Sequence, residues 1–392
     1  MNKRGPIITI IAFLLLLGAF SQAGDTAKSF GHAIPPFNQV FEKLFRHDLE
    51  LMSLDQLRTV WGILKAPEKS AIITFLGPEA HDRITKGLPA DKQAFIDEQY
   101  QQHKGTPGPD FQPIYPHILA VTDNNLTMDQ HRQTLKFLTP EEIASQSFYM
   151  GEEGRRVLFT ELTPDRTEAI LSVTEDWAFL ETGKRRYSQI RAYTSIFFKQ
   201  ERLDGTLQGV EKILLKFREK PLSIYMKWLD GPWKGRELLY NERVIGTGKV
   251  RVRESGVLGI MAVTLPVDSE IAMRGSNHMC TEVGLKYLVQ LIEEQYRKAL
   301  PKGHIKRVNH GIVALDGGKV FKMESILPKN KSLGYYCYRM IHYIDYLRSI
   351  EIKAEVFNWD DQLYESYYYT QIKLNPPLTD KDFDPDNPDY NL

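Results

Sequence analysis

The segment Tyr335–Leu374, which reads YYCYRMIHYIDYLRSIEIKAEVFNWDDQLYESYYYTQIKL, decides the fold that we predict for this chain. Within it, Ile352, Ala354 and Val356 alternate with charged residues, so the apolar side chains fall on one face of a strand. Asn358–Gln362 interrupts the alternation with turn-forming residues, and a run rich in tyrosine follows. Two such runs around a turn predict an antiparallel β-hairpin.

Alternating segments also precede this hairpin, beginning near residue 187. Asp204-Gly205 supplies a two-residue hairpin turn. The residues expected to share one face of the strand before that turn are Ile190, Ala192, Thr194 and Ile196. Further strands are expected at residues 213–217, 223–228, 236–241 and 249–253. Short strands joined by tight turns predict an antiparallel meander that curls into a barrel or half-barrel.

Two non-strand segments complete the C-terminal half. We expect Thr281 to cap a helix over Glu282–Leu300. The loop Gly256–Gly275 contains apolar residues that need cover, so it is expected to fold into or over the mouth of the sheet. The chain ends in LTDKDFDPDNPDYNL, an acidic and irregular tail whose expected anchors are Phe383 and Tyr390.

Residues 36–186 are predicted to be helical, because helix-start signals recur there. Ser53, Thr127, Thr139 and Thr163 each precede acidic residues or proline, as residues that cap helix N-termini do. When the chain is shifted by 74 residues, residues 53–96 align with residues 127–170 without a gap and with ten identities over 44 positions. This indicates a duplicated unit of about three short helices, although coincidence among helix-start residues is the alternative.

The rest of this half yields more local predictions. Lys104–Pro116, with four prolines and two glycines, is predicted to be a loop. A single helix is expected over Ile170–Leu180, with Gly183 as its C-cap. The basic run Lys184–Arg186 after it is predicted to be a solvated helix end, with a patch for an acidic partner as the alternative. The histidines of this half show no metal-ligand spacing.

Composition limits the functional classes. Hydrophobic residues make up 42% and charged residues 26% of the chain, which is typical of a globular protein. The net charge of zero argues against nucleic acid or an anionic membrane as a partner reached through bulk charge. Cys280 and Cys337 are the only cysteines, and the sequence leaves open whether they form a disulfide or remain separate thiols.

The N-terminus has the three parts of a secretory signal peptide. Lys3 and Arg4 form a basic start, Ile7–Phe20 is apolar, and the small residues Ser21 and Ala23 precede Gly24. The apolar run is shorter than the roughly 20 residues of a spanning helix, which argues against an uncleaved anchor. We therefore predict cleavage after residue 23, a periplasmic location, and a mature chain without a transmembrane span.

No residue pattern predicts catalysis. Neither a nucleophile elbow, nor a zinc-binding helix motif, nor a phosphate-binding loop is present. The most metal-like cluster is His278, Cys280 and Glu282, which is more simply explained as part of a helix start. Asp360 and Asp361 are expected to be turn residues. The tyrosines from 364 to 369 are expected to pack in the sheet, with stacking on a glycan or lipid head group as the alternative.

Three segments carry a family resemblance: MKWLDGPWKGRELLY (Met226–Tyr240), AMRGSNHMCTEVGL (Ala272–Leu285) and the end of the chain, Val356–Tyr390. They resemble a family of exported bacterial proteins, domain of unknown function 1571, over roughly residues 177–392. That family has no assigned activity, so the resemblance implies no catalytic residues. The C-terminal segment is long and specific, and the helical half lies outside the resemblance.

A looser likeness is to the LolA/LolB-type lipoprotein carriers of the periplasm. The segment that begins FFKQERLDG and the end of the chain from Tyr367 to Asp384 resemble the first and last strands of those carriers. The resemblance implies a curved, incomplete antiparallel barrel with helices that lid an apolar cavity. The carriers are small single domains, whereas this chain adds a helical region of comparable size.

These observations lead to one prediction of fold and function. The fold class is α+β, with a signal peptide at residues 1–23, a helical domain at 24–163 and a LolA-like antiparallel β domain at 164–392. The protein is predicted to be an exported binding or carrier protein for a lipid or a lipidated protein segment, without catalysis, cofactor or metal. The alternative is an envelope interaction protein whose sheet core is filled with side chains, with other envelope proteins as partners. The residues expected to line the cavity are Ile213, Leu215, Phe217, Ile224, Met226, Trp228, Val250, Val252, Ile352 and Val356.

Overall fold

The computed structural model describes residues 35–174, 176–256 and 261–392. The predicted signal peptide therefore lies outside the described residues. The chain divides into two compact units, one ending at Gly151 and one beginning at Glu152, which we call the helical unit and the β unit. Among the described residues, none of the helices combines the length and the apolar character that a membrane span requires. Whether the segment from residue 164 onward folds by itself stays a prediction.

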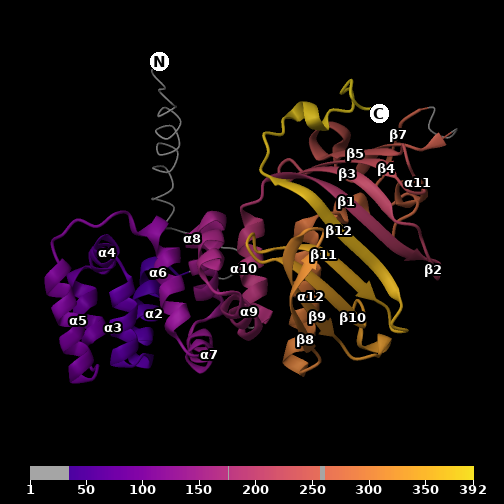
Figure 1. Ribbon diagram of the computed structural model, residues 1–392. Coiled ribbons are helices and arrows are strands. Elements are labelled where there is room, and N and C mark those ends of the chain that lie inside the picture. The colour runs from indigo at the N-terminus through magenta and orange to yellow at the C-terminus, as the bar shows by residue number, and fades with distance from the viewer. Residues whose placement is uncertain (1–34, 175, 257–260) are drawn as a thin grey trace, which may run out of the picture. The chain divides into compact units, whose positions relative to one another are not determined.

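The N-terminal half is helical, as predicted (Figure 1). Its helices are α2 (Phe37–Leu51), α3 (Leu54–Ile63), α4 (Ala66–Thr85), α5 (Ala90–His103), α6 (Phe111–Asn125), α7 (Met128–Phe137), α8 (Pro140–Glu161), α9 (Pro164–Val173) and α10 (Asp176–Ser188). The four predicted caps are confirmed, because the hydroxyls of Ser53, Thr127, Thr139 and Thr163 each accept a hydrogen bond from the backbone three residues on.

The starts of α2–α5 differ from the starts of α6–α9 by 74 residues in every case. Gly77 in α4 and Gly151 in α8 break their helices at the same relative position, with φ of 73° and 63°. The amide of Gln56 reaches the carbonyl of Asn125, and the corresponding amide of Gln130 reaches that of Leu51. We therefore propose that the duplicated unit is four helices long and not three.

Three predictions in this half are wrong. Residues 111–116 belong to helix α6 and not to a loop. Pro113 is tolerated because it lies in the first helical turn, where backbone N–H groups have no intrahelical partner. Residues 170–180 form parts of two helices, because Thr174 is the C-cap of α9. Gly183 lies inside α10 and is not its C-cap.

The basic run at the end of α10 is also placed differently from the prediction. Lys184 is fully buried, and its Nζ lies 3.0 Å from Glu293 Oε1 in helix α12 (Leu285–Ala299). Arg186 donates to Glu152 at 2.7 Å. The run is therefore part of the packing of the β unit and not a solvated helix end.

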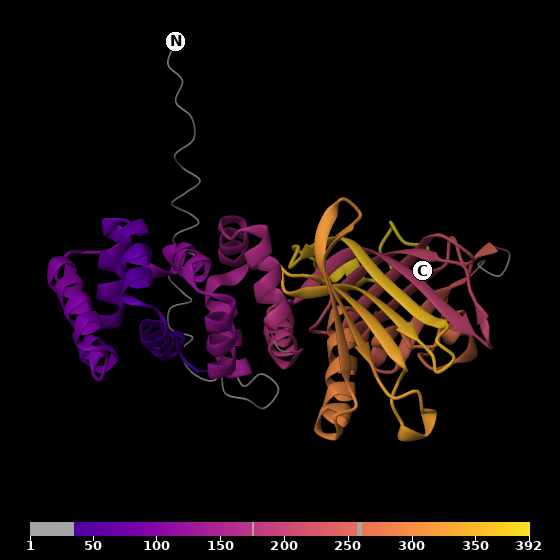
Figure 2. The same cartoon turned by 60° about the horizontal axis from the view of Figure 1, so that its bottom comes forward.

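The β unit is built on one antiparallel sheet of twelve strands, as predicted in kind (Figures 1 and 2). The strands are β1 (Ala192–Leu203), β2 (Thr206–Leu207), β3 (Glu211–Arg218), β4 (Ser223–Asp230), β5 (Glu237–Asn241), β6 (Lys249–Arg253), β7 (Val263–Pro266), β8 (Lys306–Leu315), β9 (Gly318–Ile326), β10 (Arg339–Asp345), β11 (Ile350–Phe357) and β12 (Leu363–Leu374). The order β7-β6-β5-β4-β3-β1-β12-β11-β10-β9-β8 leaves the sheet open, with β2 paired to β1.

Two predicted hairpins are confirmed. Strands β11 and β12 pair as antiparallel neighbours around the turn 358–362. Asp204 and Gly205 both have positive φ and join β1 to β2, as a type I′ turn requires. The centre of the sheet is a non-local pair, since β1 lies beside β12, with Phe197 opposite Tyr369. The first and last strands of the chain, β1 and β12, are thus neighbours in the middle of the sheet.

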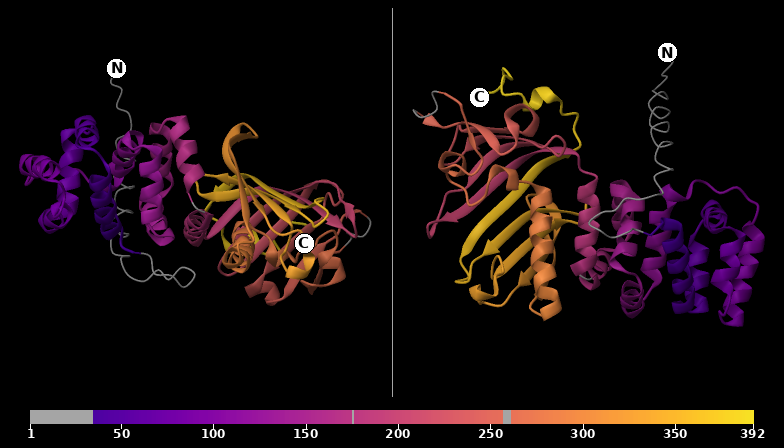
Figure 3. Two further views of the ribbon diagram at one scale, coloured as in Figure 1. Left: turned by 90° about the horizontal axis from the view of Figure 1, so that it is seen from below. Right: turned by 180° about the vertical axis from the view of Figure 1, so that it is seen from behind.

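Helix α12 lies along one face of the sheet (Figures 1 and 3), and its residues Leu285, Leu288 and Val289 belong to the main core cluster. The helix begins at Leu285, so the predicted start at Glu282 with a Thr281 cap is wrong, and a short 3₁₀ turn occupies Cys280–Glu282 instead.

The C-terminal tail is anchored as predicted, because Phe383 is buried and the ring of Tyr390 stacks on that of Tyr225, with 3.8 Å between the ring centroids. Cys280 and Cys337 are free thiols.

Candidate functional site

A pocket of about 600 Å³, including the space at its mouth, lies between the sheet and the segment 272–288 that passes over it. Strands β1, β4, β5 and β12 supply one side, and α11 (Glu270–Met273), the following loop and α12 supply the other. The apolar lining includes Phe197, Met226, Trp228, Leu238, Leu288 and Tyr369. The polar lining includes Lys199, Glu201, Arg236, Arg274, His278 and Glu282. The pocket therefore has the two-sided chemistry that an amphiphilic ligand requires.

The buried face of β1 changes from apolar to ionic along its length. Because side chains alternate across a strand, Tyr193 and Phe197 share this face with Lys199 and Glu201. The Nζ of Lys199 lies 3.4 Å from Glu201 and 3.3 Å from Glu211, and it donates to the carbonyl of Gly275 at 2.6 Å. One buried cation thus serves two buried carboxylates and holds the loop after α11.

Each of these carboxylates has further donors, as buried charges require. Glu201 accepts hydrogen bonds from the hydroxyl of Tyr367 and from the backbone of Asn277, both at 2.7 Å. Glu211 accepts from the indole of Trp228 at 2.6 Å. Burial raises the pKa of Glu211, and the charge of Lys199 opposes this shift. The pair is therefore held by hydrogen bonds as well as by charge.

A second buried cluster joins the loop to β12. The Nε2 of His278 lies 3.0 Å from Glu365 and 2.9 Å from the hydroxyl of Tyr336, and Tyr336 donates to Glu365 at 2.5 Å. Glu365 is 1% exposed. Burial alone would lower the pKa of His278, but the hydrogen bond and charge of Glu365, with the charges of Glu201 and Glu282, raise it above its ordinary value.

Burial also shifts the pKa values of two groups in and beside the pocket. It raises the pKa of the Cys280 thiol, which lines the pocket, to about 12. Burial and the charge of Glu365 raise the pKa of the Tyr336 phenol, which lies beside His278. No set of three or more His, Cys, Asp or Glu residues in the described part of the chain is arranged to hold a metal. The two ring nitrogens of His278 instead face carboxylates, with Nε2 3.0 Å from Glu365 and Nδ1 3.4 Å from Glu282.

Arg236 ties the outer wall of the pocket to the sheet. Its guanidinium is 2% exposed and donates to the carbonyls of Ile271, Ala272 and Arg274, which lie in or just after α11. The guanidinium also lies 5.1 Å from the ring of Trp228. Residues 271–274 thus cover the sheet as the sequence predicted for the segment 256–275, but the prediction that this whole segment is a loop is wrong, because it contains β7 and α11.

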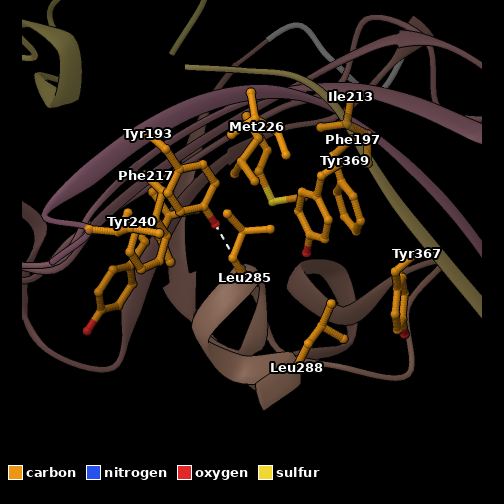
Figure 4. Close-up of a cluster of buried hydrophobic side chains, with 14 of the residues drawn as sticks. Tyr193, Phe197, Ile213, Phe217, Met226, Tyr240, Leu285, Leu288, Tyr367 and Tyr369 are labelled. Atoms are coloured by element: carbon orange, nitrogen blue, oxygen red, sulfur yellow. Dashed lines mark hydrogen bonds between the residues drawn. The ribbon is translucent and has the colours of Figure 1, made fainter. Parts of the chain in front are cut away.

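Helix α12 is docked by two tyrosine hydroxyls from the central strand pair (Figure 4). Tyr193 of β1 accepts a hydrogen bond from the backbone of Leu285, and Tyr369 of β12 accepts one from Gly284, both at 3.2 Å. These bonds satisfy backbone donors at the helix N-terminus, which has no side-chain cap. Gly284 has φ of 121°, and an added Cβ would lie 2.5 Å from the Tyr193 hydroxyl. The sequence therefore requires glycine at this contact.

The residues predicted to line a cavity are divided between the pocket and the packed core. Met226 and Trp228 line the pocket. Six others belong to the packed core cluster, which Figure 4 shows in part, and most of them are at most 1% exposed. They are Ile213, Leu215, Phe217, Ile224, Val250 and Val252. Ile352 packs at the edge of that cluster, and Val356 lies in another cluster with Cys337 and Met340. The role of these residues in ligand binding stays a proposal.

The ionic part of the pocket is not among the residues predicted from the sequence. Lys199, Glu201 and Glu365 are more than 90% buried, yet they lie in segments that were assigned only as strands. A signal was present, because Lys199 and Glu201 continue the period-two series that contains Phe197. Thr194 and Ile196 masked it, since they are β-branched but lie on the less buried face.

Residues 190–392, which form more than half of the chain and include all the residues that line the pocket, match the family model described as "Protein of unknown function (DUF1571)". The chain belongs to this family. The family resemblance drawn from the three sequence segments is thereby confirmed. None of the curated proteins compared with the chain is significantly similar to it.

Several solved structures are similar to about half of this chain at low identity. A DUF1329 family protein from Desulfovibrio piger is 11% identical, with 53% of this chain and 96% of that chain covered and a TM-score of 0.28. The lipoprotein LppX of Mycobacterium tuberculosis is 14% identical, with 52% and 99% covered and a TM-score of 0.32. A LolA superfamily protein from Nitrosomonas europaea is 11% identical, with 53% and 96% covered and a TM-score of 0.24.

The raised pKa of His278 predicts a pH dependence of stability. In the folded state the pKa of His278 lies above the unfolded value of about 6.5. Protonation of this histidine therefore stabilises the fold, and the contribution is complete below the unfolded pKa. It is lost as the pH rises through the folded-state pKa. Replacing His278 by Gln should reduce the loss of unfolding free energy between about pH 6 and pH 9, measured by denaturant titration. The His103→Gln variant is the control, since burial lowers the pKa of His103 and its removal should not reduce that loss.

Proposed function

We propose that this protein is an exported, non-catalytic binding or carrier protein, and that its β unit holds the acyl chain of a lipid or a lipidated protein segment. The observation that carries the proposal is the pocket under α12, whose apolar lining lies beside a polar rim. Phe197, Met226 and Leu288 would contact the chain. Apolar area buried there contributes about 25 cal/mol per Å², so affinity should increase with chain length.

The polar residues at the rim of the pocket favour an amphiphilic ligand over a purely apolar one. Arg274 and Glu282 keep about a third of their side chains exposed, whereas Lys199 and Glu201 are almost fully buried and already paired. A head group at the mouth would therefore meet exposed charges that can rearrange, while the buried network stays intact. The predicted periplasmic location would place the protein where such ligands pass between membranes.

One observation favours the alternative of an interaction protein without a ligand. Ile213, Leu215, Ile224 and Val250 have no measurable exposure, because α12 fills much of the sheet face above them. In this alternative the pocket would be a packing defect and not a binding site. The alternative predicts no co-purifying lipid and a strictly structural role for the residues that line the pocket.

The Met226→Glu variant separates these functions. A carboxylate on the pocket wall disfavours an acyl chain but can be hydrated through the open mouth, so lipid retention should fall by at least about tenfold with little loss of stability. Lipid is measured by native mass spectrometry and solvent extraction of the full chain from an exporting host, and stability by thermal unfolding. Met261→Glu, at a residue that is 74% exposed, is the control. An unfolded Met226→Glu variant together with lipid-free wild-type protein would support the interaction protein instead.

A further inference from the structure

The helical unit contains a second pocket, which is almost entirely apolar. Its volume is about 610 Å³ including the space at its mouth, and its lining comes from α2, α3, α4, α5 and α6 (Figure 1). A smaller pocket of about 350 Å³ adjoins it and shares Phe45, Trp61, Ile72 and Ile96 with it. The residues of both lie in the helical unit, so the pocket is independent of the function proposed for the β unit.

One carboxyl group interrupts this apolar lining. Asp48 lies on the buried stripe of α2, at helical spacing from Phe41 and Leu44, where a core helix ordinarily carries an apolar residue. Its side chain is 8% exposed, and its Oδ1 is buried without any hydrogen-bond partner. Because buried polar atoms are nearly always paired in native proteins, an unpaired carboxyl in an apolar pocket requires an explanation outside the packing of the fold.

A second polar atom in the same pocket is also unpaired. The indole Nε1 of Trp61 is buried and has no acceptor, although Trp61 lines both adjoining pockets. Asp48 is on α2 and Trp61 is on α3, so two helices each contribute a buried polar atom without a partner to this part of the core. The two need opposite partners, since a carboxylate accepts hydrogen bonds and an indole N–H donates one, so a ligand with a donor group would pair with Asp48 and not with Trp61.

The charged side chains around the pocket indicate whether the polar group of a ligand would be cationic or anionic. Among the described residues that line the pocket, Asp48 is the only carboxylate, and Lys, Arg and His are absent. The nearby carboxylate of Asp123, on α6, adds negative charge, and with burial it raises the pKa of Asp48. A cationic group would relieve this repulsion, whereas an anionic head group would increase it.

We propose that the pocket of the helical unit binds an amphiphilic amine, whose ammonium group donates to Asp48 and whose apolar part lies among Phe41, Leu44, Trp61 and Ile118. A charge-assisted hydrogen bond would satisfy the buried carboxylate, and the apolar contacts would supply most of the affinity. The sequence carries the signal of such a site, namely an acid at a stripe position of an amphipathic helix.

The test is a calorimetric titration of the full chain with three probes of equal chain length, dodecylamine, dodecanol and dodecanoate, each below its micelle concentration. Dodecylamine should bind at least tenfold more tightly than dodecanol, and dodecanoate should not bind to this pocket. Asp48→Asn keeps the size of the side chain and removes its charge, so it should weaken dodecylamine binding at least tenfold and leave dodecanol binding unchanged. Asp55→Asn is the matched control, because the side chain of Asp55 is 94% exposed, and it should have no effect.

Two further results decide the outcome. The titrations are repeated in the Met226→Glu background, where alkyl binding in the pocket of the β unit is weakened, and the preference for dodecylamine and its dependence on Asp48 should both remain. The proposal is overturned if dodecylamine does not bind, if the three probes bind alike, or if Asp48→Asn binds dodecylamine as the wild type does. Circular dichroism and thermal unfolding of Asp48→Asn establish that the variant is folded, as expected for a replacement that keeps the size of the side chain.

Discussion

Replacing Lys199 by Met should lower the unfolding free energy by about 3–5 kcal/mol, the range for removing one partner of a buried ion pair. Lys199 is 5% exposed, and its Nζ lies within 3.4 Å of both Glu201 and Glu211. Without the cation, two carboxylates would remain buried close to each other, and the carbonyl of Gly275 would lose its donor. Denaturant titration of the full chain, followed by the near-ultraviolet signal of the β unit, measures the loss.

The control for this prediction is Lys249→Met, which removes an exposed lysine of strand β6 and should change stability by less than about 0.5 kcal/mol. A further variant combines Lys199→Met with Glu211→Gln, which neutralises one of the abandoned carboxylates and should recover part of the loss. If Lys199→Met lowers the unfolding free energy by less than about 1 kcal/mol, Lys199 is not coupled to Glu201 and Glu211 as the distances indicate. These charged side chains would then have to be hydrated.

The same network determines whether the pocket exists. The loop from Gly275 to Glu282 has little regular structure, and its hydrogen bonds to the sheet include those of Gly275 with Lys199, of Asn277 with Glu201 and of His278 with Glu365. Loss of these bonds would free the loop and open the polar side of the pocket. Buried ion pairs contribute little net stability compared with apolar residues, so their presence here fits a role in holding a defined cavity.

The strands of the β unit were predictable because their signals are local. The predicted strand at residues 249–253 coincides with β6, and the Asp204-Gly205 turn joins β1 to β2. Alternation and turn chemistry act over a few residues, so a single sequence contains them in full. The pairing of β1 with β12 was not predictable in this way, because it joins segments about 170 residues apart.

The failures arose from a local helix cap that was overlooked and from tertiary contacts that override local preference. The prolines of residues 111–116 indicated a loop, yet the cap from Asp110 starts helix α6 there. Lys184 was expected in solvent, but Glu293 of α12 pairs with it in the core. Asp48 and Lys199 belong to the same class, since each is a charged residue at a buried position of its element. Such positions are also where the two candidate sites lie.

Replacing Gly284 by Ala should destabilise the β unit by about 3 kcal/mol or more. At φ of 121°, an L-residue costs about 1–3 kcal/mol in backbone strain. The added Cβ would also meet the Tyr193 hydroxyl, and the displaced helix would lose the hydrogen bonds that its backbone donates to Tyr193 and Tyr369, each worth about 1–3 kcal/mol when a buried donor is left unpaired. Thermal and denaturant unfolding of the full chain measure the effect.

Gly246→Ala separates strain from contact, because Gly246 has φ of 102° but its Cβ would meet nothing within 4 Å. It should therefore show only the strain, about 1–3 kcal/mol. Combining Gly284→Ala with Tyr193→Phe removes the hydroxyl that the Cβ meets, so the double variant should cost less than the sum of the two single variants. Equal losses for Gly284→Ala and Gly246→Ala would mean that the tyrosine hydroxyls do not fix the start of α12, and that the pocket beneath it is held by the ionic network alone.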